Sequence, residues 1–92
     1  RKEFQRHMTE QISTIKKNVD ELQDNARNYG ADEKAWLIER VPRMQNLIGD
    51  ARRELDNLRA ATQEAWPTRK KRFLSAYRQM VRYYKKLKHY IG

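Results

Sequence analysis

Apolar side chains recur at steps of three and four residues along three separate stretches of this sequence, and this period limits the possible folds more than any other feature. A step of three to four matches the 3.6-residue turn of an α-helix, so each stretch predicts a helix with one apolar face. No stretch shows the strict alternation of polar and apolar residues that indicates a β-strand. The repeating positions are Phe4, Met8, Ile12, Ile15, Val19, Leu22, Ala26 and Tyr29 in the first stretch, Leu37, Val41, Met44, Ile48, Ala51, Leu55 and Leu58 in the second, and Phe73, Tyr77, Met80, Tyr84, Leu87 and Ile91 in the third.

The first break between these stretches lies around Gly30. Glycine adopts left-handed backbone angles without a steric penalty, so we expect Gly30 to end the first helix in that conformation. Asp32 then offers a side-chain acceptor for the free N–H groups of the next helix, and Glu33 suits the positive end of that helix. A connection this short makes the first two helices antiparallel neighbours.

The second break lies at Trp66-Pro67-Thr68, where we expect Thr68 or Trp66 to be the N-cap of the third helix. The second helix should end somewhere between Arg59 and Ala65. The predicted helices therefore span about residues 3–29, 33–64 and 68–90.

Pro42 and Gly49 oppose the helical pattern of the second stretch. Proline in a helix interior costs about 3 kcal/mol, and glycine there costs about 1 kcal/mol relative to alanine. Because the apolar period continues in phase across Pro42, we predict one kinked helix. The alternative is a short helix that ends near Arg40, followed by a second helix with Pro42 in its first turn.

Ninety-two residues suffice for one domain with a modest core. Three amphipathic helices with short connections can bury their apolar faces only against one another. We therefore predict an all-α, up-down-up, left-handed antiparallel three-helix bundle over residues 1–92, and we expect a monomer. Cysteine is absent, which excludes disulfides and thiolate metal sites. Because the sequence begins with Arg1 rather than Met, we expect a domain excised from a longer protein.

Few residues are suited to catalysis or metal binding. His7 and His89 lie near opposite ends of the chain, and neither has a second ligand at the spacing that zinc requires. Two pairs of acidic residues fall on outer helix faces among basic residues, namely Asp20 with Asp24 and Asp50 with Glu54. Solvated charge explains these pairs, and no phosphate-binding loop or nucleophile motif is present. We predict no catalysis, no metal, no cofactor and no small-molecule substrate.

The net charge of +9 lies entirely in the last part of the chain. Residues 1–66 hold twelve basic and twelve acidic side chains, whereas residues 67–92 hold nine basic and no acidic ones. Arg69 to Arg72 are predicted to lie in the first turn of the third helix, where the dipole favours acidic residues, so an anion would relieve the mismatch. Solubility, or ion pairs with the first two helices, is the competing explanation. The candidate binding surface comprises Arg69, Lys70, Lys71, Arg72, Arg78, Arg82, Lys85 and Lys86.

Several short motifs accompany this helix order. They are Phe4 at the start of the first helix, Asp32-Glu33-Lys34 followed by Leu37-Ile38 and Val41, then Leu55-Asp56 and Leu58, Pro67 before the third helix, and Tyr77-Arg78 or Tyr84-Lys85 with Leu87-Lys88. Together they resemble the N-terminal three-helix domain of the vesicle-transport v-SNARE family, which is related to the Habc domains of syntaxins. Three features depart from the family: Pro42 inside the second helix, the positive charge on the third helix, and its many tyrosines.

The resemblance implies a non-catalytic module that binds adaptor or SNARE-regulatory proteins, cytoplasmic and located at the cytosolic face of endosomal or Golgi membranes. A BAG domain, with three helices and a basic third helix that grips a chaperone, fits nearly as well. So does an engineered bundle with no evolved ligand. A further hypothesis is weak electrostatic binding of nucleic acid or an anionic membrane. We predict a helical protein-interaction module whose third helix is the contact surface.

Overall fold

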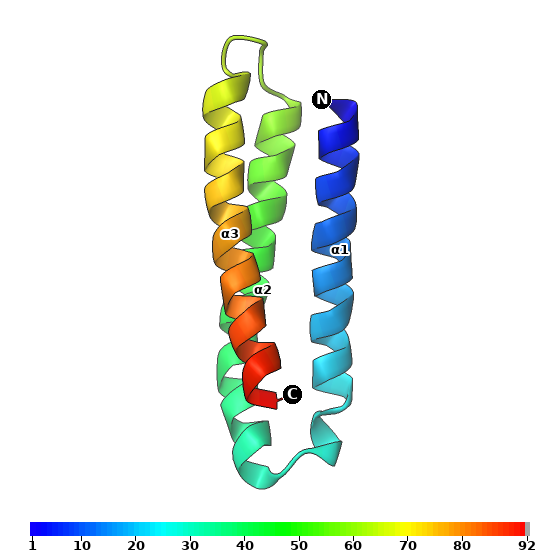
Figure 1. Cartoon of the computed structure of the whole chain (residues 1–92). Coiled ribbons are helices and arrows are strands. Elements are labelled where there is room, and N and C mark those ends of the chain that lie inside the picture. The colour runs from blue at the N-terminus through cyan, green and yellow to red at the C-terminus, as the bar shows by residue number, and fades with distance from the viewer. Residues whose placement is uncertain (92) are drawn as a thin grey trace.

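Three long helices run antiparallel to one another in the computed structural model, which describes residues 1–91 (Figure 1). Helix α1 spans Lys2–Asp24, a short 3₁₀ helix η1 spans Ala26–Asn28, α2 spans Ala31–Arg59 and α3 spans Trp66–Ile91. The chain runs down through α1, up through α2 and down again through α3 (Figure 1). The predicted all-α three-helix bundle is confirmed.

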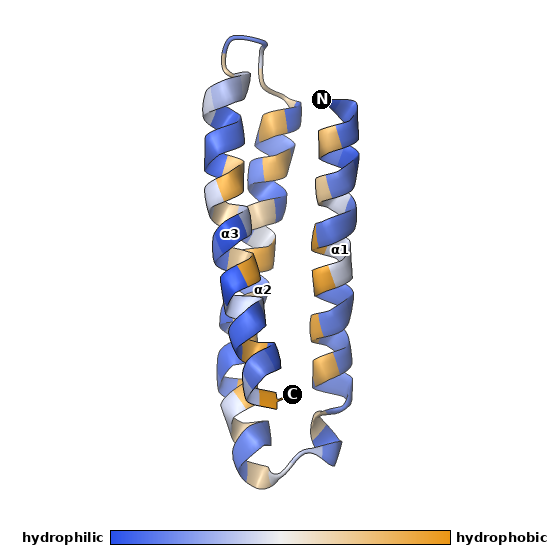
Figure 2. Cartoon of the chain, in the orientation of Figure 1, coloured by the Kyte–Doolittle hydropathy of each residue, from blue (hydrophilic) through white to orange (hydrophobic). Residues whose placement is uncertain are grey.

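The apolar faces of the helices meet inside the bundle, and the charged faces point outward (Figure 2). Helix α2 packs against both other helices, and it carries the widest buried face because two partners cover it. Leu47 belongs to this face, although the predicted apolar stripe does not include it. The buried residues are Ile12, Ile15, Val19, Ala26, Leu37, Val41, Met44, Leu47, Ile48, Ala51, Leu55, Leu58, Phe73, Met80 and Leu87.

The two helix pairs differ in how closely their backbones approach. Helices α2 and α3 lie side by side along most of their length, whereas α1 stands farther from both (Figure 1). Two small side chains of α3, Ser75 and Ala76, line a surface hollow beside α2. Large side chains bridge α1 to α3: the Phe4 and Phe73 rings are 5.9 Å apart, and Asn18 donates a 3.0 Å hydrogen bond to the Tyr84 hydroxyl.

Helix α1 ends at Asp24, five residues earlier than predicted. The Asn25 N–H donates to the Glu21 carbonyl, and the chain then tightens into η1, where the Asn28 N–H donates to the Asn25 carbonyl at 2.9 Å. Asparagine and aspartate compete with the helical backbone for hydrogen bonds, which explains an early end at Asp24-Asn25. Ala26 nevertheless remains buried, because the tighter turn keeps it directed at the core.

Gly30 serves a different purpose from the one predicted. Its backbone angles of φ −63° and ψ 163° are extended rather than left-handed, and it occupies the N-cap position of α2. The Gly30 carbonyl accepts the first helical hydrogen bond, from the Lys34 N–H at 2.9 Å. Asp32, predicted as the N-cap, instead lies with Glu33 in the first turn. Both predictions were wrong because η1 already closes the previous helix before the chain reaches Gly30.

Helix α2 ends at Arg59, which is the first residue of the predicted range for its end, and α3 begins at Trp66 rather than residue 68. The second connection is therefore longer than the bounds 33–64 and 68–90 predicted. No large apolar side chain follows Leu58 until Trp66, so packing does not extend α2 further. The Arg69 N–H donates to the Ala65 carbonyl at 3.0 Å, which makes Ala65 the N-cap in place of Thr68 or Trp66. Pro67 then lies in the first turn, where its missing N–H has no cost.

Helix α2 continues through Pro42 without a break, so the alternative of two shorter helices is wrong. Proline cannot donate to the carbonyl of Ile38, four residues earlier. Both Pro42 and Ile38 are exposed, and the Ile38 side chain has an exposed fraction of 61%. The carbonyl without a helical partner therefore lies on the solvent side, where water can satisfy it.

Candidate interaction surface on α3

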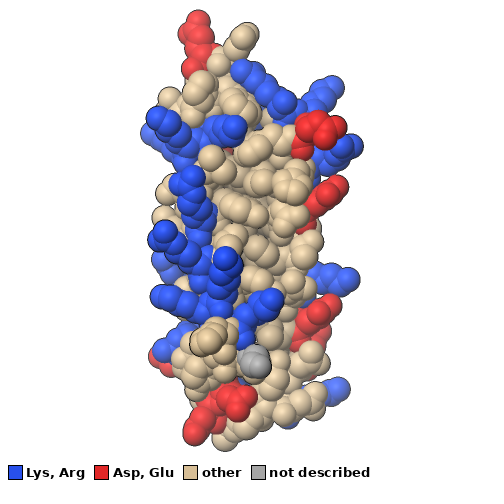
Figure 3. All heavy atoms as spheres, viewed as in Figure 1, with Lys and Arg blue, Asp and Glu red and all other residues tan. Residues whose placement is uncertain are grey.

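Ion pairing separates α3 from the rest of the molecule. Within residues 1–91, the ion pairs join side chains inside α1 or inside α2, and none involves a lysine or arginine of α3. The suggestion that α3 neutralises the acids of the first two helices is therefore not supported. Lys and Arg side chains instead form a stripe along α3, next to a broad uncharged surface (Figure 3). The exposed cations of this stripe that pack on no aromatic ring are free to meet an anionic partner.

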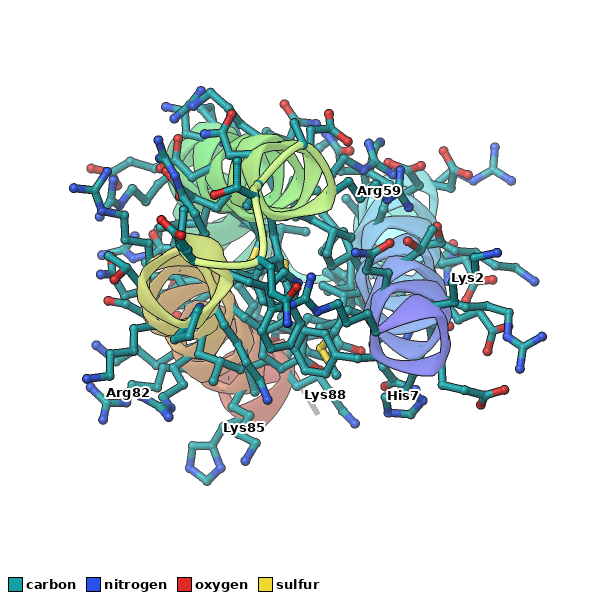
Figure 4. All side chains as sticks on the ribbon, turned by 90° about the horizontal axis from the view of Figure 1, so that it is seen from above. Lys2, His7, Arg59, Arg82, Lys85 and Lys88 are labelled. Carbon is teal, nitrogen blue, oxygen red and sulfur yellow. The ribbon has the colours of Figure 1, made fainter. Side chains whose placement is uncertain are left out.

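Five of the eight predicted site residues share the solvent side of α3. They lie opposite Phe73, Met80 and Leu87, whose side chains are fully buried. Seen from above, the labelled Arg82 and Lys85 point away from the other two helices (Figure 4). We call this surface the outer basic face, and its residues, all exposed, are Lys71, Arg78, Arg82, Lys85 and Lys86.

The remaining three predicted residues are not brought together. The Lys70 ammonium lies 4.8 Å from the centre of the Phe4 ring and 5.1 Å from that of Trp66, so it packs on aromatic faces at the top of the bundle. Arg69 is half-buried. Arg72 turns toward α2 and lines a hollow of about 340 Å³ with Glu54. Four consecutive helical residues point in different directions, about 100° apart, which explains the spread.

The electrostatic mismatch predicted at the start of α3 is also smaller than expected. Because the helix begins at Trp66, only Arg69 lies near its first turn, and Lys70 to Arg72 fall in the second. The dipole effect declines within the first turn. Pro67 in addition removes one of the free N–H groups that an anion would use. The start of α3 is therefore a weaker candidate than the outer basic face.

A second feature, missed in the sequence, lies at the other end of α3. Trp36 of α2 and Tyr90 of α3 stack with ring centres 3.9 Å apart and an interplanar angle of 11°. The Arg40 guanidinium lies 4.5 Å from the centre of the Trp36 ring, and the Arg40 side chain donates to the Trp36 carbonyl at 3.3 Å. We call the shallow depression here the aromatic hollow; it has a volume of about 580 Å³ and is lined by Trp36, Arg82, Lys85, Lys86, His89 and Tyr90.

The sequence did contain a signal for this hollow. Trp36 directly precedes the apolar stripe of the second helix but does not belong to it, and Tyr90 has the same relation to Ile91. Large aromatic residues on the flanks of two neighbouring helices indicate a contact at the rim of the interface. Pairing Trp36 with Tyr90 required the helix register, which periodicity alone does not fix.

The other tyrosines of α3 have structural contacts. Tyr77 packs against Phe73 with ring centres 5.7 Å apart, and Tyr84 accepts the hydrogen bond from Asn18. Tyr90, in contrast, has an exposed fraction of 46%. Aromatic surface is thus presented beside the outer basic face mainly at one position.

Residues 1–91 contain no group of three or more His, Cys, Asp or Glu side chains that could hold a metal ion. His7 projects outward from α1, away from the labelled Arg82 on α3 (Figure 4). None of the helices in residues 1–91 combines the length and the apolar character of a membrane span.

No protein-family model, curated protein or solved structure matches the chain. The resemblance to the v-SNARE N-terminal domain therefore stays a prediction.

Proposed function

We propose that this chain is a non-catalytic protein-interaction module that binds an acidic partner protein along the outer basic face of α3. The observation that carries the proposal is the contrast in ion pairing: five ion pairs lie inside α1 and α2, and none within residues 1–91 involves α3. Clustered like charges raise the free energy of the folded state. An acidic partner would offset that cost on binding.

A protein partner fits this surface better than a single-stranded nucleic acid does. Single-strand binders stack successive bases on several exposed aromatic side chains. Here Tyr77 and Tyr84 are partly buried against the core, and Tyr90 is the exposed aromatic residue among residues 1–91. An acidic protein surface, in contrast, can bind through the cations of α3 and a single apolar contact. Adaptor or SNARE-regulatory proteins at endosomal or Golgi membranes are the partners that the v-SNARE resemblance implies.

The proposal is tested by binding of a Glu-rich helical peptide, measured by fluorescence anisotropy at low and moderate salt. The double variant Arg78→Glu/Lys85→Glu changes two residues of the outer basic face. The control variant Lys17→Glu/Arg43→Glu changes two exposed cations of α1 and α2 that take part in no ion pair within residues 1–91. Each reversal lowers the net charge by two, so both variants fall from +9 to +5.

We expect the α3 variant to lose about tenfold or more in affinity, and the control to lose only about two- to threefold through the general field. Equal losses would mean that net charge alone attracts the peptide. Random-sequence duplex DNA and anionic vesicles form the other arms of the experiment. Tighter binding to either of these, with a steep decline as salt rises, would assign the basic face to that polyanion instead.

A further inference from the structure

We infer that the aromatic hollow is an anchor site for one apolar side chain of the acidic partner, held between flanking carboxylates. The inference deepens the proposed function and rests on it. The partner must then carry, at the position that meets the hollow, an aromatic or large aliphatic residue with aspartate or glutamate on both sides. The site combines an exposed aromatic ring with a positively charged rim, and neither the helical period nor the net charge of the sequence specifies it.

The rings in the hollow are held by contacts on both faces of Trp36. The Tyr90 ring stacks on one face of Trp36, with ring centres 3.9 Å apart. The Arg40 guanidinium lies 4.5 Å from the centre of the Trp36 ring, and because Tyr90 covers the first face, Arg40 lies over the second. Arg40 is in turn held by hydrogen bonds to the Trp36 carbonyl and to Glu39. The layered arrangement joins the first turns of α2 to the last turns of α3. A rigid aromatic surface loses little conformational entropy when a partner binds.

The Tyr90 ring remains partly available. With one face on Trp36, the residue still has an exposed fraction of 46%, the largest of any Phe, Trp or Tyr within residues 1–91. An apolar side chain that covers this ring removes apolar surface from water on both partners. Tyrosine is enriched at the centres of protein interfaces because it combines apolar area with a polar hydroxyl.

The rim of the hollow defines the charge of the occupant. The side chains of Arg82, Lys85 and Lys86 line it together with His89, and none of its lining residues is acidic. Glu39, one turn beyond Trp36 on α2, is already paired with Arg40 at 3.4 Å. An apolar residue alone would leave these cations without partners, whereas flanking carboxylates complement them. Charge and shape therefore both favour an acidic segment with one apolar anchor.

A second exposed apolar site provides the contrast and a control. A hollow of about 390 Å³ lies between the end of α1 and α2, where Ile38 has an exposed fraction of 61%. Its rim is mixed in charge, with Asp24, Arg27 and Lys34 around it. This site lacks the single sign of charge that would select an acidic segment. Ile38→Ala therefore removes exposed apolar surface without touching the aromatic hollow.

The experiment compares two Glu-rich peptides that are identical except for one central residue, Phe in the anchored peptide and Ala in the other. The protein carries Trp66→Phe, which preserves an aromatic ring against Phe4 and leaves Trp36 as the one tryptophan. Affinity is measured by anisotropy of the labelled peptide, and Trp36 emission reports contact at the hollow. Tyr90→Ala and Ile38→Ala are introduced separately into this protein.

We expect the anchored peptide to bind about tenfold more tightly than the Ala peptide and to change the Trp36 emission. The preference should vanish in Tyr90→Ala and persist in Ile38→Ala. Tyr90 is the next-to-last residue of α3 and is exposed, so circular dichroism should show an unchanged fold in that variant.

Equal affinities of the two peptides for the unsubstituted hollow, or a preference that survives Tyr90→Ala, would overturn the anchor site and leave the electrostatic function standing. Failure of both peptides to bind would overturn the proposed function itself. An oligo-dT probe provides the last arm. If it binds more tightly than the anchored peptide and weakens in Tyr90→Ala, the hollow takes a nucleic-acid base and the peptide proposal is wrong.

Discussion

Helices α1 and α3 both pack against α2, yet they differ in how they are held and in how their charges are used. Helix α3 lies close to α2 along its length, and its core residues Phe73, Met80 and Leu87 are fully buried. Helix α1 stands farther away and reaches α3 through a few long side chains. The two helices also differ in ion pairing. Charged side chains of α1 form ion pairs with one another, such as Lys16 with Asp20 at 2.6 Å, whereas no charged side chain of α3 forms an ion pair within residues 1–91.

On α3, the buried side contributes to stability and the exposed basic side is available for recognition. The inner side of α3 is held by the fully buried Phe73, Met80 and Leu87, so the helix can present unpaired cations on its outer side without losing its position. Helix α1 has neither the close packing nor the excess charge. The two helices can therefore be compared by making matched substitutions in each.

The largest effect is expected for the matched pair Phe73→Ala and Phe4→Ala. Phe73 is fully buried, and its removal leaves a cavity that should cost about 3–5 kcal/mol of unfolding free energy. Phe4 is half-buried at the end of α1, so the same change should cost only about 1–2 kcal/mol. Urea denaturation followed by circular dichroism measures both. Equal losses would show that α1 is packed as tightly as α3.

The same packing explains how much of the fold the sequence could predict. A period of 3.6 residues identified core positions such as Val19, Met44 and Phe73, because burial on one side of a helix requires that spacing. Leu47 was missed because the width of a buried face depends on how many neighbours cover it. Helix ends were missed at Asn25 and Ala65, where local hydrogen bonds between backbone groups decide the boundary.

The candidate site was predictable only in part, for a related reason. Arg78 and Lys85 are seven residues apart and out of phase with the apolar stripe of their helix. Their place on the solvent side of α3 therefore follows from one helix alone. The positions of Lys70 and Tyr90 depend on rings from other helices, Phe4 and Trp36. Those partners are 66 and 54 positions away in the sequence (70 − 4 and 90 − 36). Contacts at such separations follow from the packing register, which a single sequence does not display.

Tyr84→Phe tests the connection between α1 and α3. It removes the hydroxyl that accepts the 3.0 Å hydrogen bond from Asn18 and leaves the ring in place. The partly buried Asn18 amide then loses its partner, and we expect a loss of about 1 kcal/mol in unfolding free energy. Hydrogen exchange should accelerate at α1 amides more than at α2 or α3 amides. Uniform acceleration would mean that α1 does not open separately.

Gly49→Ala changes α2, the helix that both others share. Gly49 is exposed, its φ is not positive, and a Cβ built there meets no atom within 4 Å. We expect stabilisation of about 0.5–1 kcal/mol, because alanine favours the helix and restricts the unfolded chain. Thermal denaturation measures the gain. Tyr84→Phe should lower the unfolding free energy by the same amount in the Gly49→Ala protein as in the original one, since the two sites share no contact. A different loss would show that α2 couples the two sites.

The smallest effect distinguishes the two helices by sign. Arg82→Glu puts an acid within one turn of Arg78, Lys85 and Lys86, so it should stabilise α3 by about 0.5 kcal/mol at low salt. Lys17→Glu puts an acid next to Asp20 and Glu21 on α1, so it should destabilise by about the same amount. Both shifts should decline at high salt, because screening weakens exposed charge pairs. Urea denaturation of each variant at two salt concentrations measures them.

The signs of these two stability changes test whether the outer basic face has a cost that ligand binding explains. If Arg82→Glu stabilises the protein and abolishes peptide binding, the native arginine has a cost in stability that binding explains. If Arg82→Glu leaves the unfolding free energy unchanged at low salt, the clustered cations have no measurable cost. The contrast in ion pairing between α1 and α3 would then be a difference in solvation only, and it would no longer support a ligand for α3.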